Sequence, residues 1–350
     1  MSFFAILFAL MIEQVRPLAV TNPVYEAARS WARTARKTLD AGQRPHGWLT
    51  WSALVLLPAL VALLLHWVLV WSLGWYGTVL VFALHVAVLY VTLGFRQFSH
   101  HFTVMRDALE AGDEALARAT LAAWKRVDAR DLPKTEVVRH VIEHSILDAH
   151  RHVFGVLGWY ALLAAFGFGP VGAIVYRMSE FALRYYKRGS ANAGSLLVSP
   201  SLLAAAQQAW LVVDYLPARV TALGFAIVGN FEEAIDSWRS FSQRLGRSGG
   251  SDGLNDNDGI ILAATSGALN VRLGGEALKE VFAPMAAQAM QVDGILPPDV
   301  RPGTPETSAE TSAGREPTVA HLRSVVGLVW RSVVLWMLLL ALLTLARLLG

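Results

Sequence analysis

The sequence has no cysteine, which excludes a disulfide framework and thiolate chemistry. Charged residues are also scarce, at 16% of a chain of 350 residues, whereas hydrophobic residues reach 54%. The mean hydropathy is accordingly positive, at +0.43. A composition with so little charge is typical of an integral membrane protein and argues against a soluble domain.

Basic and acidic residues nearly balance, and the formal net charge is only +3. The basic residues lie beside apolar runs and do not form a surface on which aromatic and basic side chains alternate. Nucleic acid is therefore not an expected partner. Membrane lipid is an expected partner, because anionic headgroups attract basic segments that flank membrane spans.

Three apolar runs are long enough to cross a bilayer. Residues 49–73 and 78–95 are joined by the uncharged Gly74-Trp75-Tyr76-Gly77 and predict a membrane hairpin. Residues 325–349 predict a C-terminal transmembrane helix. His66 and His85 fall inside the hairpin, where packing or hydrogen bonding is a commoner role for histidine than ligand binding.

The other segments are more polar. Ser2 to Met11 is too short to span and predicts an interfacial or docking helix. Residues 96–152 are rich in arginine and lysine, which predicts a small cytoplasmic helical region by the positive-inside rule. Within it, helical spacing of apolar residues predicts one helix over 107–127 and a second that begins at Asp131-Leu132-Pro133.

Toward the C-terminus the pattern alternates between short helices and loops. The expected elements are a helix over 231–241, a flexible loop over 246–259, a helix over 260–272 stopped by the glycines at 274 and 275, and a disordered linker over 293–317. Together these features predict an all-α, polytopic integral membrane protein, with residues 1–290 as its membrane domain.

Two further apolar runs contain breaks, and each can be threaded in two ways. Residues 153–176 are interrupted by Gly167-Phe168-Gly169-Pro170, and residues 202–229 carry charges and a proline near their centre. Each run either crosses once or folds back at its break. Charge bias favours folding back, since this keeps the basic cluster around Lys187 on the cytoplasmic side.

The second break contains Asp214, Pro217 and Arg219. Charged residues in an apolar run are costly unless they pair or face a polar cavity. Proline removes a backbone donor and disfavours helix at the preceding residue, so we expect a polar elbow in which Asp214 and Arg219 are partners. A simple interfacial loop is the alternative.

A polar row could hold a metal ion, since His140, His144 and Asp148 recur at every fourth residue. Any amphipathic helix has such a row, however, and a solvated or interdomain polar face is the favoured interpretation. No metal site is predicted.

Several blocks of sequence resemble the CobD/CbiB family of membrane proteins. Residues 169–177 resemble its Gly-Pro-x-Gly-Ala segment with a Tyr-Arg end, and residues 216–223 resemble its Ile-Pro-Ala-Arg-Leu-Thr segment. Asn257-Asp258-Gly259 and residues 267–275 resemble its Asn-Ala-Gly and Gly-Ala-Leu-Gly-Val-Arg-Leu-Gly-Gly segments. The blocks occur in the family's order.

The resemblance implies an adenosylcobinamide-phosphate synthase of cobalamin biosynthesis in a bacterial-type inner membrane. Such an enzyme attaches aminopropanol or its phosphate to the corrinoid adenosylcobyric acid. Amide formation needs an activated carboxylate, which implies ATP with Mg²⁺ held by oxygen ligands. The candidate catalytic residues are Glu143, Asp214 and Arg219, and the candidate ligand-binding residues are Tyr176, Arg177, Asn257 and Arg272.

Three oxygen-rich motifs of the family are replaced in this chain. Its Glu-Asn-x-x-Asp motif corresponds to residues 147–151, and its Asn-Thr-x-Asp motif corresponds to residues 180–183. A pair of family aspartates falls at Trp210 and Leu211, so that only Asp214 is acidic there. Since hydrocarbon does not coordinate Mg²⁺, these departures predict a degenerate catalytic site.

A second resemblance gives an alternative function. The apolar N-terminal run, the Asp214-Tyr215-x-Pro-x-Arg segment, residues 229–238 and the terminal span are similar to AmpE, a non-enzymatic membrane regulator.

Overall fold

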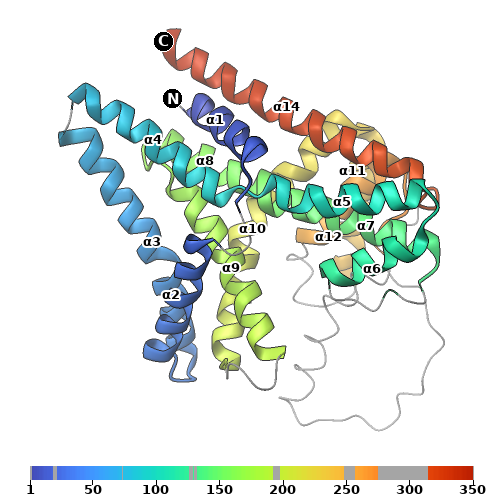
Figure 1. Ribbon diagram of the computed structural model, residues 1–350, viewed down its shortest axis with the longest axis horizontal. Helices are drawn as coiled ribbons and strands as arrows, with labels where there is room; N and C mark the ends of the chain where they lie inside the picture. Colours follow the sequence, from blue (N-terminus) through green and yellow to red (C-terminus); the bar gives the residue numbers. More distant parts are fainter. Residues whose placement is uncertain are drawn as a thin grey trace. The chain divides into compact units, whose positions relative to one another are not determined.

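The structure is a computed structural model that describes residues 2–18, 22–72, 74–125, 129, 132–191, 198–247, 257–274 and 314–349. Nearly all of these residues are helical (Figure 1). The helices are α1 (Ser2–Val15), α2 (Pro23–Leu39), α3 (Arg44–Ser72), α4 (Gly74–Thr92), α5 (Phe95–Glu110), α6 (Glu114–Lys125), α7 (Lys134–Ala149), the π-helix η1 (His150–Phe154), α8 (Gly155–Ala165), α9 (Val171–Ala191), α10 (Pro200–Val228), α11 (Phe231–Arg247), α12 (Asn257–Leu269) and α14 (Val319–Leu349).

Four of the described helices, α3, α4, α10 and α14, are long and apolar enough to cross a membrane. Their exposed side chains include many large apolar ones, such as Val61 and Val68 on α3 and Leu343 on α14. Apolar surface of this kind is stable in hydrocarbon and costly in water. The predicted all-α, polytopic membrane fold is therefore confirmed.

The chain forms two compact units. The first unit combines residues 1–100, 148–221 and 333–350, and the second combines residues 101–147 and 222–332. Helices α5, α7, α10 and α14 each have residues in both units.

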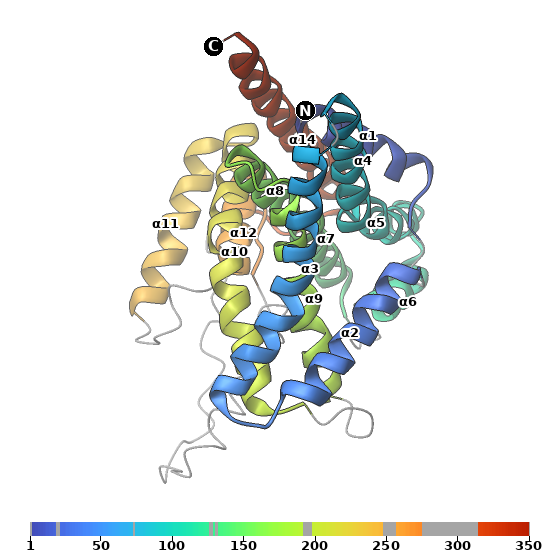
Figure 2. The same ribbon diagram turned by 90° about the vertical axis from the view of Figure 1, so that its left-hand side faces the viewer.

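The first unit is organised around the predicted hairpin of α3 and α4. α3 also packs against α9 and α2, and α1 packs on α4 (Figure 2). The rings of Phe8 on α1 and Phe82 on α4 make an edge-to-face contact, with centroids 5.8 Å apart. This unit contains a core of buried apolar side chains that includes Leu54, Tyr186 and Leu202. Burial of these side chains holds α2, α3, α9 and the start of α10 together.

The hairpin turn is shorter than expected. Gly74 to Gly77, predicted as the connection, instead form the first turn of α4. Gly74 itself has a left-handed φ of 52°, a conformation that costs glycine little.

The first of the two broken runs folds back as predicted. α8 ends at Ala165 and α9 begins at Val171, and the two helices pack against each other. Gly167 and Gly169 allow the turn, because both have positive φ values, 83° and 63°.

In the second unit the predicted helix over 107–127 is wrong. The chain turns at Gly112, and Asp113 starts α6 by accepting a hydrogen bond from the backbone N–H of Leu116 at 2.9 Å. Asp113 is an N-cap that splits the predicted helix into α5 and α6. The predicted helix that follows Pro133 is confirmed as α7.

Three expected boundaries near the C-terminus also differ. α11 continues to Arg247 instead of ending at 241, and α12 begins at Asn257, inside the expected loop. α12 ends at Leu269 because Asn270 adopts a left-handed φ of 53° before the expected glycine stop. Most of the expected linker over 293–317 lies outside the described residues; the described end places Arg315 beside Val271.

Candidate functional site

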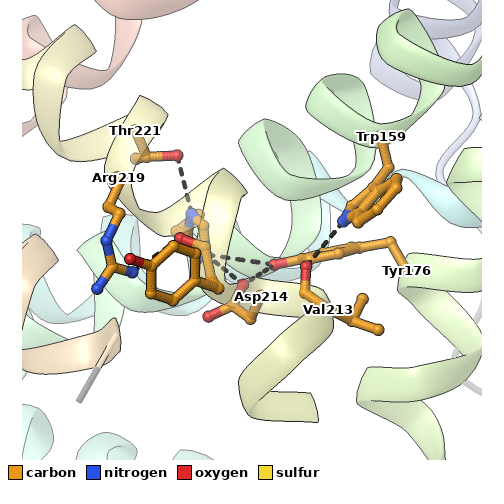
Figure 3. A network of polar contacts seen from close by, with 8 residues as sticks. Trp159, Tyr176, Val213, Asp214, Arg219 and Thr221 are labelled. Carbon is orange, nitrogen blue, oxygen red and sulfur yellow. Dashed lines mark hydrogen bonds and ion pairs between the residues drawn. The ribbon is translucent and has the colours of Figure 1, made fainter. Parts of the chain in front are cut away.

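Helix α10 runs without interruption through Pro217, so the predicted elbow is wrong. Proline cannot donate the backbone hydrogen bond that would reach the carbonyl of Val213 one turn earlier. That carbonyl instead accepts a hydrogen bond from the indole Nε1 of Trp159 on α8, at 2.8 Å (Figure 3). The indole satisfies the acceptor that Pro217 leaves open, which removes much of the cost of proline inside a helix.

We expect Trp159→Phe to lower the free energy of unfolding by about 1–3 kcal/mol, because it leaves the partly buried Val213 carbonyl without this donor. In a Pro217→Ala background the new backbone N–H can bond to that carbonyl. Trp159→Phe should therefore lower the free energy of unfolding by less in that background. Unfolding in detergent of both single variants and the double variant checks this. Equal costs in the two backgrounds would show that the indole does not replace the missing backbone bond.

Asp214 lies at the centre of a fully buried polar cluster in the first unit. Its Oδ1 accepts hydrogen bonds from the Tyr176 hydroxyl at 2.8 Å and lies 2.8 Å from Nε2 of His150. Nδ1 of His150 lies 2.9 Å from the hydroxyl oxygen of Thr221. These side chains are at most 2% exposed. The polar cluster therefore joins η1, α9 and α10 through one carboxylate (Figure 3).

Two features of the backbone bring these groups together. The π-helix η1 begins at His150, and such wide turns reorient side chains relative to a regular α-helix. Gly155 leaves the space that the Tyr176 ring occupies, since a Cβ at position 155 would lie 2.0 Å from Tyr176 Cζ. The local sequence thus permits contacts between residues far apart in the chain.

The polar cluster can hold a proton at a defined place. Burial raises the pKa of the Tyr176 hydroxyl well above its usual value, and the charge of the neighbouring Asp214 raises it further. Tyr176 therefore remains a hydrogen-bond donor at neutral pH. The second carboxylate oxygen of Asp214 is buried and has no hydrogen-bond partner among the described residues. Asp214 is thus the residue of the cluster that can accept a further hydrogen bond.

Arg219 is not the partner of Asp214. On a continuous helix, residues five apart point about 140° away from each other. Arg219 donates to the backbone oxygen of Tyr215 at 2.9 Å, and its guanidinium carbon lies 3.4 Å above the Tyr215 ring. The predicted Asp214–Arg219 pair is therefore wrong, and the two candidates have different surroundings.

Arg177 belongs to a second polar group in the first unit. It donates to Glu180 at 3.1 Å and to the hydroxyl of Tyr25 on α2 at 3.0 Å, and Arg184 lies 3.4 Å from the same carboxylate. Burial alone would raise the pKa of the Glu180 carboxyl, but the charges of Arg184 and Arg177 outweigh it and hold that pKa below its usual value. Glu180 is thus part of an ion pair, not a vacant metal ligand.

We expect Glu180→Gln to lower the free energy of unfolding by about 3 kcal/mol at pH 7, because Arg177 would remain buried without its counter-charge. The folded-state pKa of Glu180 lies below the unfolded value of about 4.3, so the stabilisation is complete above that pH and is lost as pH falls through the folded-state pKa. The difference in the free energy of unfolding between Glu180→Gln and the unchanged protein should therefore become smaller in acid. Denaturation in detergent across a pH series measures it. Exposed Glu26→Gln is the control; an equal loss there would contradict the pairing.

The remaining candidates lie in the second unit. Oε1 of Glu143 accepts a hydrogen bond from the backbone N–H of Gly274 at 2.7 Å, and Glu143 is 1% exposed. Asn257 is buried at the first residue of α12, and the backbone N–H of Arg272 donates to the carbonyl of Arg315 at 2.8 Å. The structure brings Glu143 close to the block 267–275, while Asp214, Tyr176 and Arg177 belong to the first unit.

The acidic residues considered for Mg²⁺ do not form a cluster among the described residues. Among the described residues no three His, Cys, Asp or Glu side chains lie close enough together to hold a metal. Glu143, Glu180 and Asp214 each accept hydrogen bonds from protein groups at separate places. On α7, His140 is only 5% exposed and stacks on His144 at 6.0 Å, so a solvated face is the wrong description of His140.

Sequence spacing did not predict the contact of His150 with Asp214 or the contact of His85 with Tyr160. His150 carries no local motif, and its relation to Asp214 is a contact across 64 residues. His66 and His85 are confirmed as hydrogen-bonded, since His85 lies 3.3 Å from His66 and 2.8 Å from the hydroxyl of Tyr160. Tyr160 had no sequence signal.

The family model described as CobD/Cbib protein matches residues 3–182, which is more than half of the chain. The chain belongs to the CobD/CbiB family. The match includes His150, Tyr176 and Arg177, whereas Asp214 and the later sequence blocks lie beyond it. The predicted family resemblance is confirmed.

Similar CobD/CbiB proteins are found in several bacteria. A protein of Chromobacterium violaceum named cobalamin biosynthesis protein CobD is 32% identical over 194 residues, 55% of each chain. A protein of Stutzerimonas stutzeri with the same name is 26% identical over 301 residues, 85% of this chain and 82% of the relative. The chain thus spans about half the length of the first relative and most of the second. No solved structure matches. These comparisons give no support to the AmpE-like alternative.

Proposed function

We propose that this CobD/CbiB protein acts in cobalamin biosynthesis and binds a corrinoid at a bacterial inner membrane. The family match over residues 3–182 carries the proposal, and the four helices able to span a membrane support the location. The names of the relatives from Chromobacterium violaceum and Stutzerimonas stutzeri agree with this pathway.

The reaction expected of such a protein is the attachment of aminopropanol or its phosphate to adenosylcobyric acid. ATP and Mg²⁺ would supply an activated carboxylate, but the described acidic residues do not fit a metal ion. We therefore propose that corrinoid binding is retained and that amide-forming activity is weak. Asp214 is the proposed proton acceptor for the amine in any residual reaction, since one of its oxygens has no hydrogen-bond partner among the described residues.

Guanidinium groups are the proposed contacts to the corrinoid. Arginine binds carboxylate and phosphate oxygens in well-defined geometry, and Arg272 lies in a block that resembles the family. Purified protein mixed with cobyric acid should retain the coloured corrinoid on gel filtration in detergent. Arg272→Gln should weaken retention at least several-fold, while Arg106→Gln, at a partly exposed arginine paired with Asp107, should not. Passage of all the corrinoid as free ligand would contradict the proposal.

Complementation tests the weakness of amide formation. A strain that lacks the ordinary synthase and receives only this protein should grow poorly on cobyric acid but normally on cobinamide, which enters after the missing step. Growth on both compounds at the same rate would show that Glu143, Asp148, Glu180 and Asp214 support catalysis despite their separate positions.

A further inference from the structure

A cavity of about 470 Å³ lies in the first unit, between α2, α3, α4 and α9. Its lining is almost entirely apolar and includes Trp31, Pro58, Val88 and Phe181. Thr92 also lines it, but its hydroxyl donates to the backbone oxygen of Val88 at 2.8 Å. The cavity has the size of a small-molecule site, for which volumes of about 300–1,000 Å³ are usual.

The cavity lies at membrane depth on two of the spanning helices. Pro58 is fourteen residues before Ser72, the last residue of α3, and Val88 is fourteen residues after Gly74, the first residue of α4. Both are thus about 20 Å along the hairpin from its turn, within a hydrocarbon core that is about 30 Å thick. An occupant of this cavity would therefore lie at the depth of the acyl chains.

Positive charge lies at the cavity wall. Arg177 lines it and is 6% exposed, and its Nε has no hydrogen-bond partner among the described residues. Arg177 and Arg184 together face one carboxylate, that of Glu180, which leaves one net positive charge. An apolar cavity beside a group with this net positive charge is complementary to a molecule with an apolar chain and an anionic head.

α2 also carries basic side chains on its exposed face. Arg29, Arg33 and Lys37 are exposed and lie one turn apart along one face of the helix. The opposite face carries buried Ala32 and Ala35. Such a helix attracts the anionic surface of a bilayer.

We propose that this cavity binds an anionic phospholipid of the membrane, with one acyl chain between α3, α4 and α9 and the phosphate at Arg177 and Arg184. The corrinoid is larger and more polar than this cavity, and aminopropanol phosphate would leave the apolar lining without contacts. The lipid site is therefore separate from the proposed corrinoid site, and neither proposal depends on the other.

Native mass spectrometry of the full-length protein tests the lipid site. After exchange into detergent with phosphatidylglycerol or with phosphatidylcholine of the same acyl chains, the protein should retain one phosphatidylglycerol with at least tenfold preference. Val88→Trp fills the cavity and should abolish this retention. Val79→Trp makes the same change on α4 at a residue that is 53% exposed and does not line the cavity, and should leave retention unchanged.

Charge is tested separately. Arg184→Gln should reduce the preference for phosphatidylglycerol several-fold, whereas Arg106→Gln, in the second unit, should not. If Val88→Trp does not fold, Ile174→Phe fills the cavity from α9. Equal retention of the two lipids, or phosphatidylglycerol retained by the cavity-filling variants, would overturn the proposal. A cavity-filling variant that changes the oligomeric state without lipid loss would assign the cavity to a second copy of the chain.

Discussion

Asp214→Asn is expected to lower the free energy of unfolding by about 3 kcal/mol, because one carboxylate oxygen serves both Tyr176 and His150 in a fully buried place. The amide keeps the size of the side chain, so the loss reports hydrogen bonding and charge instead of a cavity. Chemical unfolding in detergent, followed by circular dichroism, measures the change.

The control is Arg219→Gln, which should change stability by less than about 1 kcal/mol, since Arg219 is only half-buried and bonds within its own helix turn. The effects of the two substitutions should add, because the side chains are not partners. A double variant of Asp214→Asn and Tyr176→Phe should instead cost less than the sum of the single changes. Additivity in that pair, or coupling between Asp214 and Arg219, would refute the cluster.

Gly155→Ala is expected to cost about 3 kcal/mol although it adds a single methyl group. The new Cβ would lie 2.0 Å from Cζ of Tyr176, and that ring is held by its hydroxyl, which donates a hydrogen bond to Asp214 and lies 3.2 Å from Nε2 of His150. The ring cannot move aside without breaking them, so overpacking and loss of the polar cluster are combined. Thermal unfolding in detergent measures the effect.

The same helix offers a matched control. Gly158→Ala places a Cβ no closer than 3.9 Å to any neighbour, here Cη2 of Trp336, which is ordinary van der Waals contact. Alanine is a better helix former than glycine, so this variant should be more stable by up to about 1 kcal/mol. Opposite signs for two identical substitutions three residues apart would locate the constraint at Tyr176. A similar loss in both would mean that α8 tolerates no added methyl group.

Local signals predicted the parts of the fold that depend on neighbouring residues. The length of the apolar runs predicted the α3–α4 hairpin, and the glycines before Pro170 predicted the return of the chain between α8 and α9. Pro217 gave an equally clear local signal, yet α10 continues through it. The helix continues because Trp159 supplies a donor to the carbonyl of Val213. Trp159 lies 54 residues before Val213, so no local pattern contains it.

The candidate site was predictable to a similar extent. Asp214 and Tyr176 could be found as individual residues, one by its charge in an apolar run and the other by the family resemblance. Their common partner His150 could not, because no spacing relates residues 64 positions apart. The elbow was wrong for the same reason: it assigned Asp214 the nearest opposite charge, whereas the partners of Asp214 are Tyr176 on α9 and His150 in η1.

The indole bond between Trp159 and Val213 also has a consequence for biogenesis. Inserted alone, α10 would present to lipid both a carboxylate and a backbone carbonyl that lacks its helical donor, and each such group costs several kcal/mol in hydrocarbon. Trp159, His150 and Tyr176 all precede α10 in the chain, so the ribosome delivers the donors before the acceptors. The order of synthesis thus allows α10 to enter the bilayer beside the α8–α9 hairpin that already carries its donors. A circular permutant that begins with α10 would place the donors after the acceptors and so remove that advantage.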